Sequence, residues 1–354
     1  MTKLSILDQS PIISGHTPVE AIAATVELAQ AADQLGYERY WLAEHHGLNA
    51  LADPCPEILL ARLGSVTKHI RIGTGGILLP YYSPFKVAEQ FRMLEALFPG
   101  RMDLGIGRAP GGDMRTAQAV MGSTTGGSYN AAEYFPQQVM ELIAHLDGVM
   151  PSDHPHAEVV LQPQCTAGDK DGAPQIWVLG SSDYGGAMAA HLGLRFAFAH
   201  FINAYSGAPV AQAYRDDFKP TPHADQTRGA VTPVPYSAVA VFAIAAETQA
   251  QADELATSVD VRRVQMAYGI NAPIATVEEA KTRAEHFNER DRAIIERERP
   301  RAVVGTPDKV AARIREVQAE FAADEVVVLG VAASYKARLK SYELLAREFE
   351  LKSR

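Results

Sequence analysis

The sequence predicts an α/β fold of the (β/α)8 TIM-barrel type, with insertions. Eight short runs rich in β-branched and aromatic residues alternate with helical patterns along the 354 residues. Barrels with insertions commonly exceed about 250 residues, so one domain can span residues 1–354. Hydrophobic residues make up 47% of the chain, which is enough to bury a large core.

Each expected strand is a short run in which apolar residues alternate with polar ones or follow one another directly. In chain order the runs are KLSILDQ (3–9), RYWLAEH (39–45), IRIGTGGILL (70–79), RMDLGIGR (101–108), QIWVLG (175–180), RFAFAHF (195–201), SAVAVFAIAA (237–246) and EVVVLG (325–330).

Helix signals between these runs support the alternation. Thr17 and Glu20 form a capping box around a proline, and Gly36 ends that helix. Ser-Pro at 83–84 and Thr-Pro at 306–307 begin two further helices. These capping signals position the helices, and they give no information about a catalytic or binding site.

Two segments interrupt the regular alternation. Residues 109–130 are rich in Gly, Ser and Thr, and so long a loop after a barrel strand is typical of an active-site cover. Residues 268–301 form a second insertion, whose later half is densely charged with both signs. A solvated helix with i,i+4 ion pairs explains that half more simply than a partner-binding segment.

Composition excludes several classes of protein. The formal net charge is −9 and the basic residues are scattered, so no nucleic-acid partner is expected. The two cysteines, Cys55 and Cys165, lack the spacing of a zinc site and predict reduced thiols rather than a disulfide framework. No leader pattern and no apolar run of bilayer length is visible, so we expect a cytoplasmic protein without a membrane partner.

The active site of such a barrel lies where the strands end. The candidates there are Asp8, Gln9, Glu44, His45, His46, Thr74, Gly75, Gly76, Arg108, Gly180, Ser181 and Ser182. Successive strand residues point to opposite faces, so Glu44 and His45 cannot both enter the barrel, and His45 and His46 cannot hold one metal ion. His154 and His156 have H-x-H spacing but lie in a polar, proline-containing stretch, and no metal site is expected.

Two stretches could bind an anion. Gly180, Ser181 and Ser182 stand between a strand and a helix start, where backbone N–H groups can hold a phosphate, although a serine there could simply cap the helix. Arg108 offers a planar positive charge to an anion, or forms a surface ion pair. DLGIGRAPGGD begins like a dinucleotide fingerprint but has Pro110 in place of the third glycine, so no Rossmann site is expected.

Taken together, these stretches resemble the bacterial luciferase-like, flavin-dependent monooxygenase superfamily. The resemblance extends in order through GYERYWLAEHH, IRIGTGGILLP, SPFKVAEQFRMLEALFPGRMDLGIGRAP, APQIWVLGSS and VVGTPDKVAARI. It implies a (β/α)8 barrel that binds FMN at the mouth formed by the C-terminal ends of its strands.

The resemblance also implies roles for individual residues. His45 corresponds to the family's active-site histidine beside the flavin, which stabilises or protonates the flavin peroxide or acts as a base. Gly75 and Gly76 correspond to a non-prolyl cis peptide under the isoalloxazine ring. Arg108 and Ser181 correspond to positions near the FMN phosphate, with Gly180 contributing its backbone and Ser182 following in the same turn.

The chain departs from the luciferases at two places. Residues 121–140 contain no Lys or Arg, so the luciferases' further phosphate-binding arginine has no counterpart there. Gly107 replaces the luciferase cysteine, so light emission is not the expected function.

The resulting hypothesis is an FMN-dependent monooxygenase. Reduced FMN would react with O2 to give a C4a-(hydro)peroxide, which oxygenates a small organic substrate in a pocket shaped by Asp8 and Gln9. Asp8 could equally hold its own loop. A separate NAD(P)H-dependent flavin reductase would supply reduced flavin, and the resemblance implies a homodimer. The alternatives are hydride transfer with a deazaflavin and a non-catalytic flavin-binding protein.

Overall fold

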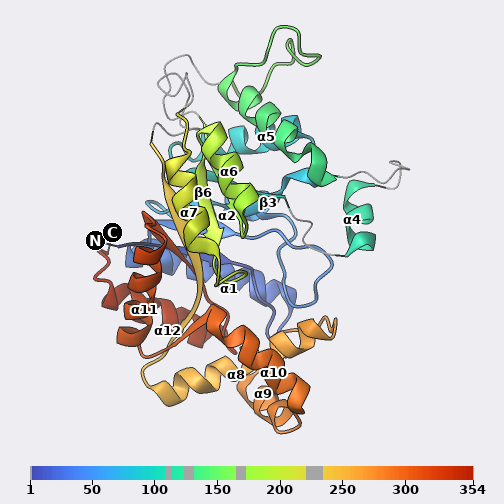
Figure 1. Cartoon of the computed structure of the whole chain (residues 1–354). Coiled ribbons are helices and arrows are strands. Elements are labelled where there is room, and N and C mark those ends of the chain that lie inside the picture. The colour runs from blue at the N-terminus through green and yellow to red at the C-terminus, as the bar shows by residue number, and fades with distance from the viewer. Residues whose placement is uncertain (1, 109–112, 123–130, 165–172, 221–233, 354) are drawn as a thin grey trace.

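A computed structural model describes residues 2–108, 113–122, 131–164, 173–220 and 234–353. Eight parallel strands close into a barrel with helices around it (Figure 1). The sheet order is β6-β5-β4-β3-β2-β1-β9-β7, and a further pairing between β6 and β7 closes the ring. The predicted (β/α)8 TIM barrel is therefore confirmed.

The eight barrel strands coincide with the eight runs expected from the sequence. They are β1 (Lys3–Asp8), β2 (Arg39–Leu42), β3 (Arg71–Leu78), β4 (Met102–Gly107), β5 (Gln175–Gly180), β6 (Arg195–Ala199), β7 (Ser237–Ala245) and β9 (Glu325–Leu329).

A further short strand, β8 (Ala302–Gly305), pairs with β7 beyond the barrel ring. β7 contacts β6 and β9 through its first half and then pairs with β8 through Phe242–Ala245. A four-residue strand between an insertion and a helix has too little periodicity to be identified from sequence, and it was not expected.

Helices connect the strands and surround the barrel. They are α1 (Pro18–Leu35), α2 (Pro56–Val66), α3 (Pro84–Leu97), α4 (Met114–Met121), α5 (Ala131–Asp147), α6 (Asp183–Leu192), α7 (Gly207–Asp216), α8 (Gln249–Ala267), α9 (Val277–Ala284), α10 (Glu289–Glu298), α11 (Pro307–Glu320) and α12 (Tyr335–Glu348), with short 3-10 turns η1 (Leu79–Tyr81) and η2 (Arg299–Arg301).

Local signals explain where α1 begins and ends. The side chain of Thr17 accepts a hydrogen bond from the backbone N–H of Glu20, whose carboxylate accepts one from the backbone of Thr17. Gly36 ends the helix with a φ of 85°, and a Cβ there would lie 2.1 Å from the carbonyl oxygen of Lys352. A glycine is therefore required where the last residues of the chain pass this helix end.

The apolar core has two layers, because strand side chains alternate between the barrel interior and the surrounding helices. Leu7, Trp41 and Trp177 belong to the inner cluster. Tyr40 and Leu42, on the opposite face of β2, belong to the outer cluster between strands and helices. This alternation decides which residues at the strand ends can face the barrel mouth.

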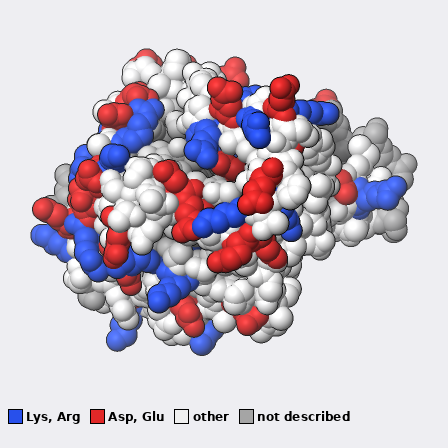
Figure 2. Space-filling model, turned by 90° about the horizontal axis from the view of Figure 1, so that it is seen from below, with Lys and Arg blue, Asp and Glu red and all other residues white. Residues whose placement is uncertain are grey.

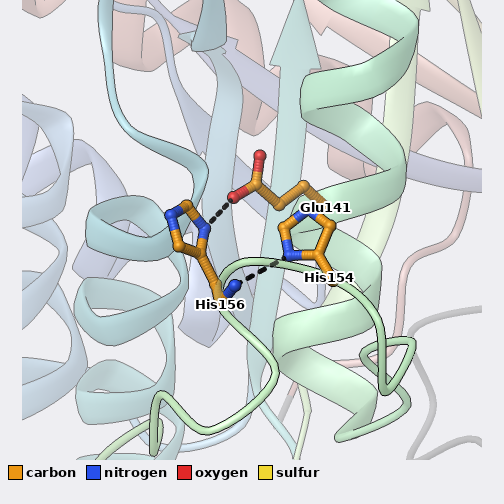
Figure 3. A group of neighbouring side chains, drawn as sticks. All are labelled: Glu141, His154 and His156. Carbon is orange, nitrogen blue, oxygen red and sulfur yellow. Dashed lines mark hydrogen bonds and ion pairs between the residues drawn. The ribbon is translucent and has the colours of Figure 1, made fainter.

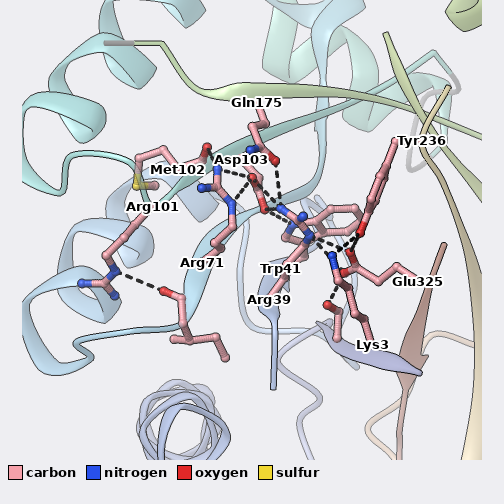
Figure 4. A network of polar contacts seen from close by, with 12 residues as sticks. Lys3, Arg39, Trp41, Arg71, Arg101, Met102, Asp103, Gln175, Tyr236 and Glu325 are labelled. Carbon is pink, nitrogen blue, oxygen red and sulfur yellow. Dashed lines mark hydrogen bonds and ion pairs between the residues drawn. The ribbon is translucent and has the colours of Figure 1, made fainter. Parts of the chain in front are cut away.

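Charged side chains close the N-terminal end of the barrel (Figure 4). The buried guanidinium of Arg39 lies 2.9 Å from Asp103 and 3.0 Å from Glu325. Arg71 lies 2.7 Å from Asp103, which also accepts a 3.0 Å hydrogen bond from the indole of Trp41. Burial alone would raise the pKa of Asp103, but the guanidinium groups of Arg39 and Arg71 lower it below its ordinary value.

The two expected insertions have distinct structures. Within 109–130, α4 occupies Met114–Met121, while 109–112 and 123–130 lie outside the described residues. The segment 268–301 forms α9, α10 and η2, whose Lys281 and Arg299 pair with Glu254 and Asp260 of α8. These pairs join separate helices. Most side chains of residues 281–299 are exposed, as expected for a solvated segment, and within the insertion Arg301 pairs with Glu298, three positions earlier.

Basic and acidic side chains are interspersed on the face seen in Figure 2. Among the described residues, no helix has the length and apolar character needed to cross a bilayer.

Candidate active site

The C-terminal ends of the strands bring most of the candidate residues to one end of the barrel. The parallel pairing continues past the end of β2, because the N–H of Ala43 donates to the carbonyl of Asp8 at 2.9 Å. Trp41 and Ala43 belong to the inner cluster, whereas Leu42 belongs to the outer one. The three residues before Glu44 therefore alternate between the barrel interior and the helices, as the prediction for Glu44 and His45 requires.

Glu44 is buried and faces the turn after β3. Its carboxylate accepts hydrogen bonds from the N–H of Leu78 at 2.8 Å and from the hydroxyl of Tyr82 at 2.6 Å. The Nε2 atom of His46 lies 2.6 Å from the same carboxylate. Glu44 and His46 thus join the end of β2 to the end of β3, and both carboxylate oxygens of Glu44 and Nε2 of His46 are occupied.

His45 has a different environment from its neighbour. Its side chain is half-buried, and its Nδ1 atom is buried without a hydrogen-bond partner among the described residues. Burial, together with the nearby charges of His46 and Arg262, lowers the pKa of His45 to about 4, against the opposing effect of a hydrogen bond to the backbone of Ala43. The imidazole is neutral at pH 7, whereas an unperturbed histidine would titrate near neutrality.

A buried carboxyl group lies beside this histidine. The carbonyl of Asp53 accepts a hydrogen bond from the N–H of His45 at 3.3 Å, and its side chain accepts one from the N–H of Cys55 at 3.0 Å. Burial raises the pKa of Asp53 to about 7, helped by the charges of Asp8 and nearby glutamates. Burial and the same acidic surroundings raise the pKa of the Cys55 thiol, which therefore stays protonated.

The glycine pair on β3 is joined by a cis peptide bond between Gly75 and Gly76, as the resemblance implies. The pairing of β3 with β4 shifts register at this point, so the strand bulges. A Cβ on Gly75 would lie 2.6 Å from Leu7 Cδ1, and a Cβ on Gly76 would lie 2.5 Å from the carbonyl oxygen of Gly105. Neither position can accept a side chain without movement of its neighbours.

Arg108 and the turn after β5 lie together. The guanidinium of Arg108 is 4.0 Å from the ring centroid of Tyr184, in the first turn of α6. Arg108 makes no ion pair with a described residue. Of the two roles left open by the sequence, the surface ion pair is therefore not seen among these residues. Its charge is available beside the N-terminal end of α6.

The N–H of Tyr184 in the β5–α6 turn donates to the side chain of Asp183 at 2.8 Å, but the serines of the turn do not occupy its other donors. Ser182 occupies the N-cap position of α6, but its side chain makes no capping hydrogen bond. The carbonyl of Ser181 accepts a 3.0 Å hydrogen bond from Asn203, which holds the turn from the neighbouring loop. Gly180 approaches Gly185 closely, since a Cβ on Gly180 would lie 3.5 Å from the Cα of Gly185. The remaining backbone N–H groups of this helix start can face an anion.

Asp8 does not join these residues. Its carboxylate is fully buried and accepts hydrogen bonds from the N–H of Ser10 at 2.7 Å, from Arg338 at 2.5 Å and from Tyr40. These partners lie on the helix side of the strand, so the alternative in which Asp8 holds its own loop matches the geometry. Gln9 follows it, half-buried at the end of β1.

The segment after α8 covers the loop that follows the histidine pair. Asn271 accepts a 2.7 Å hydrogen bond from the N–H of Asn49 and donates one of 2.9 Å to the carbonyl of Gly47. Arg262 of α8 is half-buried, and its charge acts on His45. α8 thus contributes a cation to this end of the barrel, and the segment that follows it contributes Asn271.

Three residues of this region were not among the sequence candidates: Asp53, Tyr82 and Arg262. Asp53 precedes a proline and reads as a turn residue, and Tyr82 follows a strand in an ordinary Tyr-Tyr-Ser-Pro turn. Arg262 lies on a helix far along the chain. Only the tertiary contacts identify them.

Comparisons with known proteins agree with this architecture. The sequence model of the family described as luciferase-like monooxygenase matches residues 2–324. The protein YceB of Bacillus subtilis (strain 168) is 39% identical, over 99% of this chain and 100% of its own length. An N-acetyl-S-alkylcysteine monooxygenase of the same organism is 32% identical, over 98% of both. The crystal structure of apo-MsnO8 is 35% identical, covers 100% of both chains and has a TM-score of 0.87.

More distant structures share the fold alone. One is the oxygenating constituent of a Baeyer-Villiger monooxygenase from Pseudomonas putida in complex with FMN, 17% identical with a TM-score of 0.68, covering 98% of this chain and 97% of that one. Another is an F420-dependent secondary alcohol dehydrogenase, 13% identical with a TM-score of 0.67, covering 99% of both. The oxygenase component of a flavin-dependent trigonelline monooxygenase from Acinetobacter baylyi is 40% identical over 23% of each chain.

Proposed function

Because the chain belongs to the luciferase-like monooxygenase family, we propose that it oxygenates a small organic substrate with reduced FMN and O2. The family prediction made from the sequence is confirmed, and with it the prediction of a monooxygenase. The observation that carries the finer proposal is His45, a neutral imidazole with a buried, unpartnered Nδ1 at the C-terminal end of the barrel.

The residues at the barrel mouth fit FMN. Arg108 and the helix start after Ser181 and Ser182, which Ser182 leaves uncapped, offer a positive charge and N–H donors to a phosphate. Gly75 and Gly76 expose backbone without side chains on β3, where a planar ring can approach closely. Reduced FMN would supply the activation of O2.

His45 has the properties of a group that exchanges a hydrogen bond or a proton with that ring. A neutral imidazole can donate from one nitrogen and accept at the other, and its unpartnered Nδ1 needs a partner that the described residues do not supply. Because its pKa is depressed, the imidazole is uncharged at neutral pH, so it can accept a hydrogen bond or a proton there.

The substrates to test first are N-acetyl-S-alkylcysteines, the class named for one full-length relative. Such molecules carry a carboxylate, and the half-buried guanidinium of Arg262 near His45 supports recognition of an anion. Asp8 is committed to Arg338, so Gln9 is the better candidate for a pocket residue on β1.

A separate NAD(P)H-dependent reductase would provide reduced FMN. The name of one partial relative, an oxygenase component, supports such a two-component arrangement. We further propose a homodimer in the cytoplasm, in line with the family resemblance and the low cysteine content. Light scattering of the purified chain tests the dimer directly.

The proposal is tested by isotope labelling. Chemically reduced FMN, the protein and an N-acetyl-S-alkylcysteine are mixed with 18O2, and one labelled oxygen atom is expected in the product and the other in water. Product formed without label, or formed without oxygen from a reduced deazaflavin, would support hydride transfer instead. Tight flavin binding without any product from a panel of thioethers and ketones would favour a binding protein.

A further inference from the structure

A cluster of histidines and a glutamate lies outside the barrel mouth (Figure 3). Among the described residues, Glu141, His154 and His156 form a group whose potential ligand atoms all lie within 4.8 Å of one another. Glu141 projects from α5, and the two histidines come from the segment that follows this helix. The Nδ1 atom of His156 lies 2.9 Å from Oε1 of Glu141.

A fourth side chain faces the same carboxylate. His145 follows Glu141 by one helical turn, and its Nε2 lies 3.7 Å from Oε1 of Glu141, too far for a hydrogen bond. The side chain of His145 is only 3% exposed, and its Nε2 has no hydrogen-bond partner among the described residues. Its ring packs against Phe85 of α3 and stacks on His156. A buried nitrogen without a partner is therefore directed at the cluster.

The loop that carries the two histidines is held by its own turns. The N–H of His154 donates to Pro151, and that of Ala157 to His154, each at 3.0 Å. The N–H of His156 donates to Nδ1 of His154 at 3.2 Å, which ties the two residues together. Local hydrogen bonds thus fix the shape of the H-x-H loop, and the contact between His156 and Glu141 joins it to α5.

We propose that Glu141, His145, His154 and His156 bind a divalent transition-metal ion of the Zn2+ type. Imidazole nitrogens and one carboxylate are ligands that Zn2+ prefers, whereas Ca2+ and Mg2+ require mainly oxygen ligands. The ion would take the place of the proton between His156 and Glu141 and would give the buried Nε2 of His145 a partner. Tetrahedral bonds of about 2.0–2.2 Å place the ligand atoms roughly 3.3–3.6 Å apart, so the His156–Glu141 pair would open from 2.9 Å and the wider separations would close.

Such an ion would fix the segment 154–156 to α5 and, through His145, to α3. Its role is structural, since the cluster lies in the helix layer rather than inside the barrel. The sequence displays the H-x-H spacing, but Glu141 and His145 lie too far from it along the chain to be recognised as its partners.

Metal binding to the full-length, tag-free protein tests the proposal. After treatment with EDTA, the protein is titrated with ZnCl2 against a chelating dye, and one equivalent per chain is expected to bind. His154→Ala, His156→Ala and Glu141→Gln should each weaken binding at least about tenfold, since even loss of an outer-shell partner costs 10–100-fold. His286→Ala should bind as wild type, because this exposed histidine contacts only the carbonyl of Thr282.

Cobalt substitution tests the ligand set independently of affinity. One bound Co2+ should give the intense visible absorption of a four-coordinate site, and His145→Phe should change that spectrum while keeping the packing on Phe85. Circular dichroism establishes that each variant is folded. The proposal is overturned if wild type binds no stoichiometric Zn2+, if the His154 and His156 variants bind as wild type, or if His145→Phe leaves the cobalt spectrum unchanged.

Discussion

His45 and His46 are neighbours in sequence, yet their rings have different contacts. His46 is held by Glu44, whereas Nδ1 of His45 is buried without a partner among the described residues. Strand alternation predicts that Glu44 and His45 diverge, and the resemblance identifies His45 as the active-site histidine. The depressed pKa of His45 could not be predicted, because it arises from burial and from Arg262, more than two hundred positions away in the sequence.

Arg108 should distinguish FMN from riboflavin. Arg108→Ala is expected to weaken binding of reduced FMN by about tenfold or more, since a hydrogen bond to a charged group contributes about 1.5–3 kcal/mol. Riboflavin lacks the phosphate, so its affinity should change little. Anaerobic fluorescence titration of both flavins measures the ratio. Arg62→Ala, an exposed arginine on α2, should leave both affinities unchanged; equal losses for FMN and riboflavin in Arg108→Ala would exclude a phosphate contact.

Asp53 should make the protein less stable as pH rises. The pKa of its carboxyl is about 7 in the folded protein against an ordinary value of 3.8, so between these values only the unfolded chain has released the proton. The free energy of unfolding therefore falls as pH rises from about 4 to 7. A shift of three units corresponds to roughly 4 kcal/mol, which is an upper bound.

Asp53→Asn removes this contribution while retaining the acceptor for the N–H of Cys55. Urea unfolding at pH 5 and pH 8 should show a smaller loss of stability in the variant than in wild type. Some loss should remain, because burial also raises the pKa of Glu95 to about 7. Identical pH profiles for the two proteins would show that Asp53 is ionised in the folded state.

At the scale of elements, β3 packs so closely against its neighbours that Gly75 and Gly76 leave no room for a side chain. The resemblance implies a cis peptide bond between Gly75 and Gly76, and the structure has that bond together with a register shift at the same point. The charge pattern of the insertion 268–301 predicts a solvated helix, and most of residues 281–299 are exposed and helical. It does not predict the contacts that Asn271, Lys281 and Arg299 make with other elements. Charge patterns do not specify distant partners.

A methyl group at Gly76 should disturb the contact of β3 with β4. Its Cβ would lie 2.5 Å from the carbonyl oxygen of Gly105, and backbone cannot move aside as a side chain can. Overpacking of this kind costs about 1–3 kcal/mol. Gly180→Ala is the matched control, because its nearest contact would be an ordinary 3.5 Å. Thermal unfolding should show a large loss for Gly76→Ala only; equal melting temperatures for the two variants would refute the packing argument.

At the scale of the whole molecule, the two ends of the barrel differ in chemistry. The N-terminal end holds a closed network of buried ion pairs, and the C-terminal end holds unpartnered polar groups. The strand count and barrel class follow from alternation, since each of the eight sequence runs spans six residues or more and shows its pattern even where the strand itself is shorter. The network could not be predicted, because Arg39, Asp103 and Glu325 meet only when the barrel closes.

Arg39→Met should lower the free energy of unfolding by about 3–5 kcal/mol, the usual effect of leaving buried charges without their partner. Asp103 and Glu325 would both lose contacts to the guanidinium. Lys86→Met breaks the exposed pair with Glu89 and should cost at most about 1 kcal/mol. Denaturant titration compares the two variants with wild type. If Arg39→Met lowers the free energy of unfolding no more than Lys86→Met does, the buried network does not stabilise the fold as proposed.

The most direct test of the central claim is rapid mixing with oxygen. Protein saturated with reduced FMN is mixed with oxygenated buffer, and near-ultraviolet flavin absorbance is followed in wild type, His45→Ala and His69→Ala, whose exposed histidine lies just before β3. We predict a transient band in wild type and His69→Ala that free reduced FMN does not give, with a lifetime at least about tenfold shorter in His45→Ala. Flavin oxidation in wild type without any transient, or a transient unchanged in His45→Ala, would contradict the account.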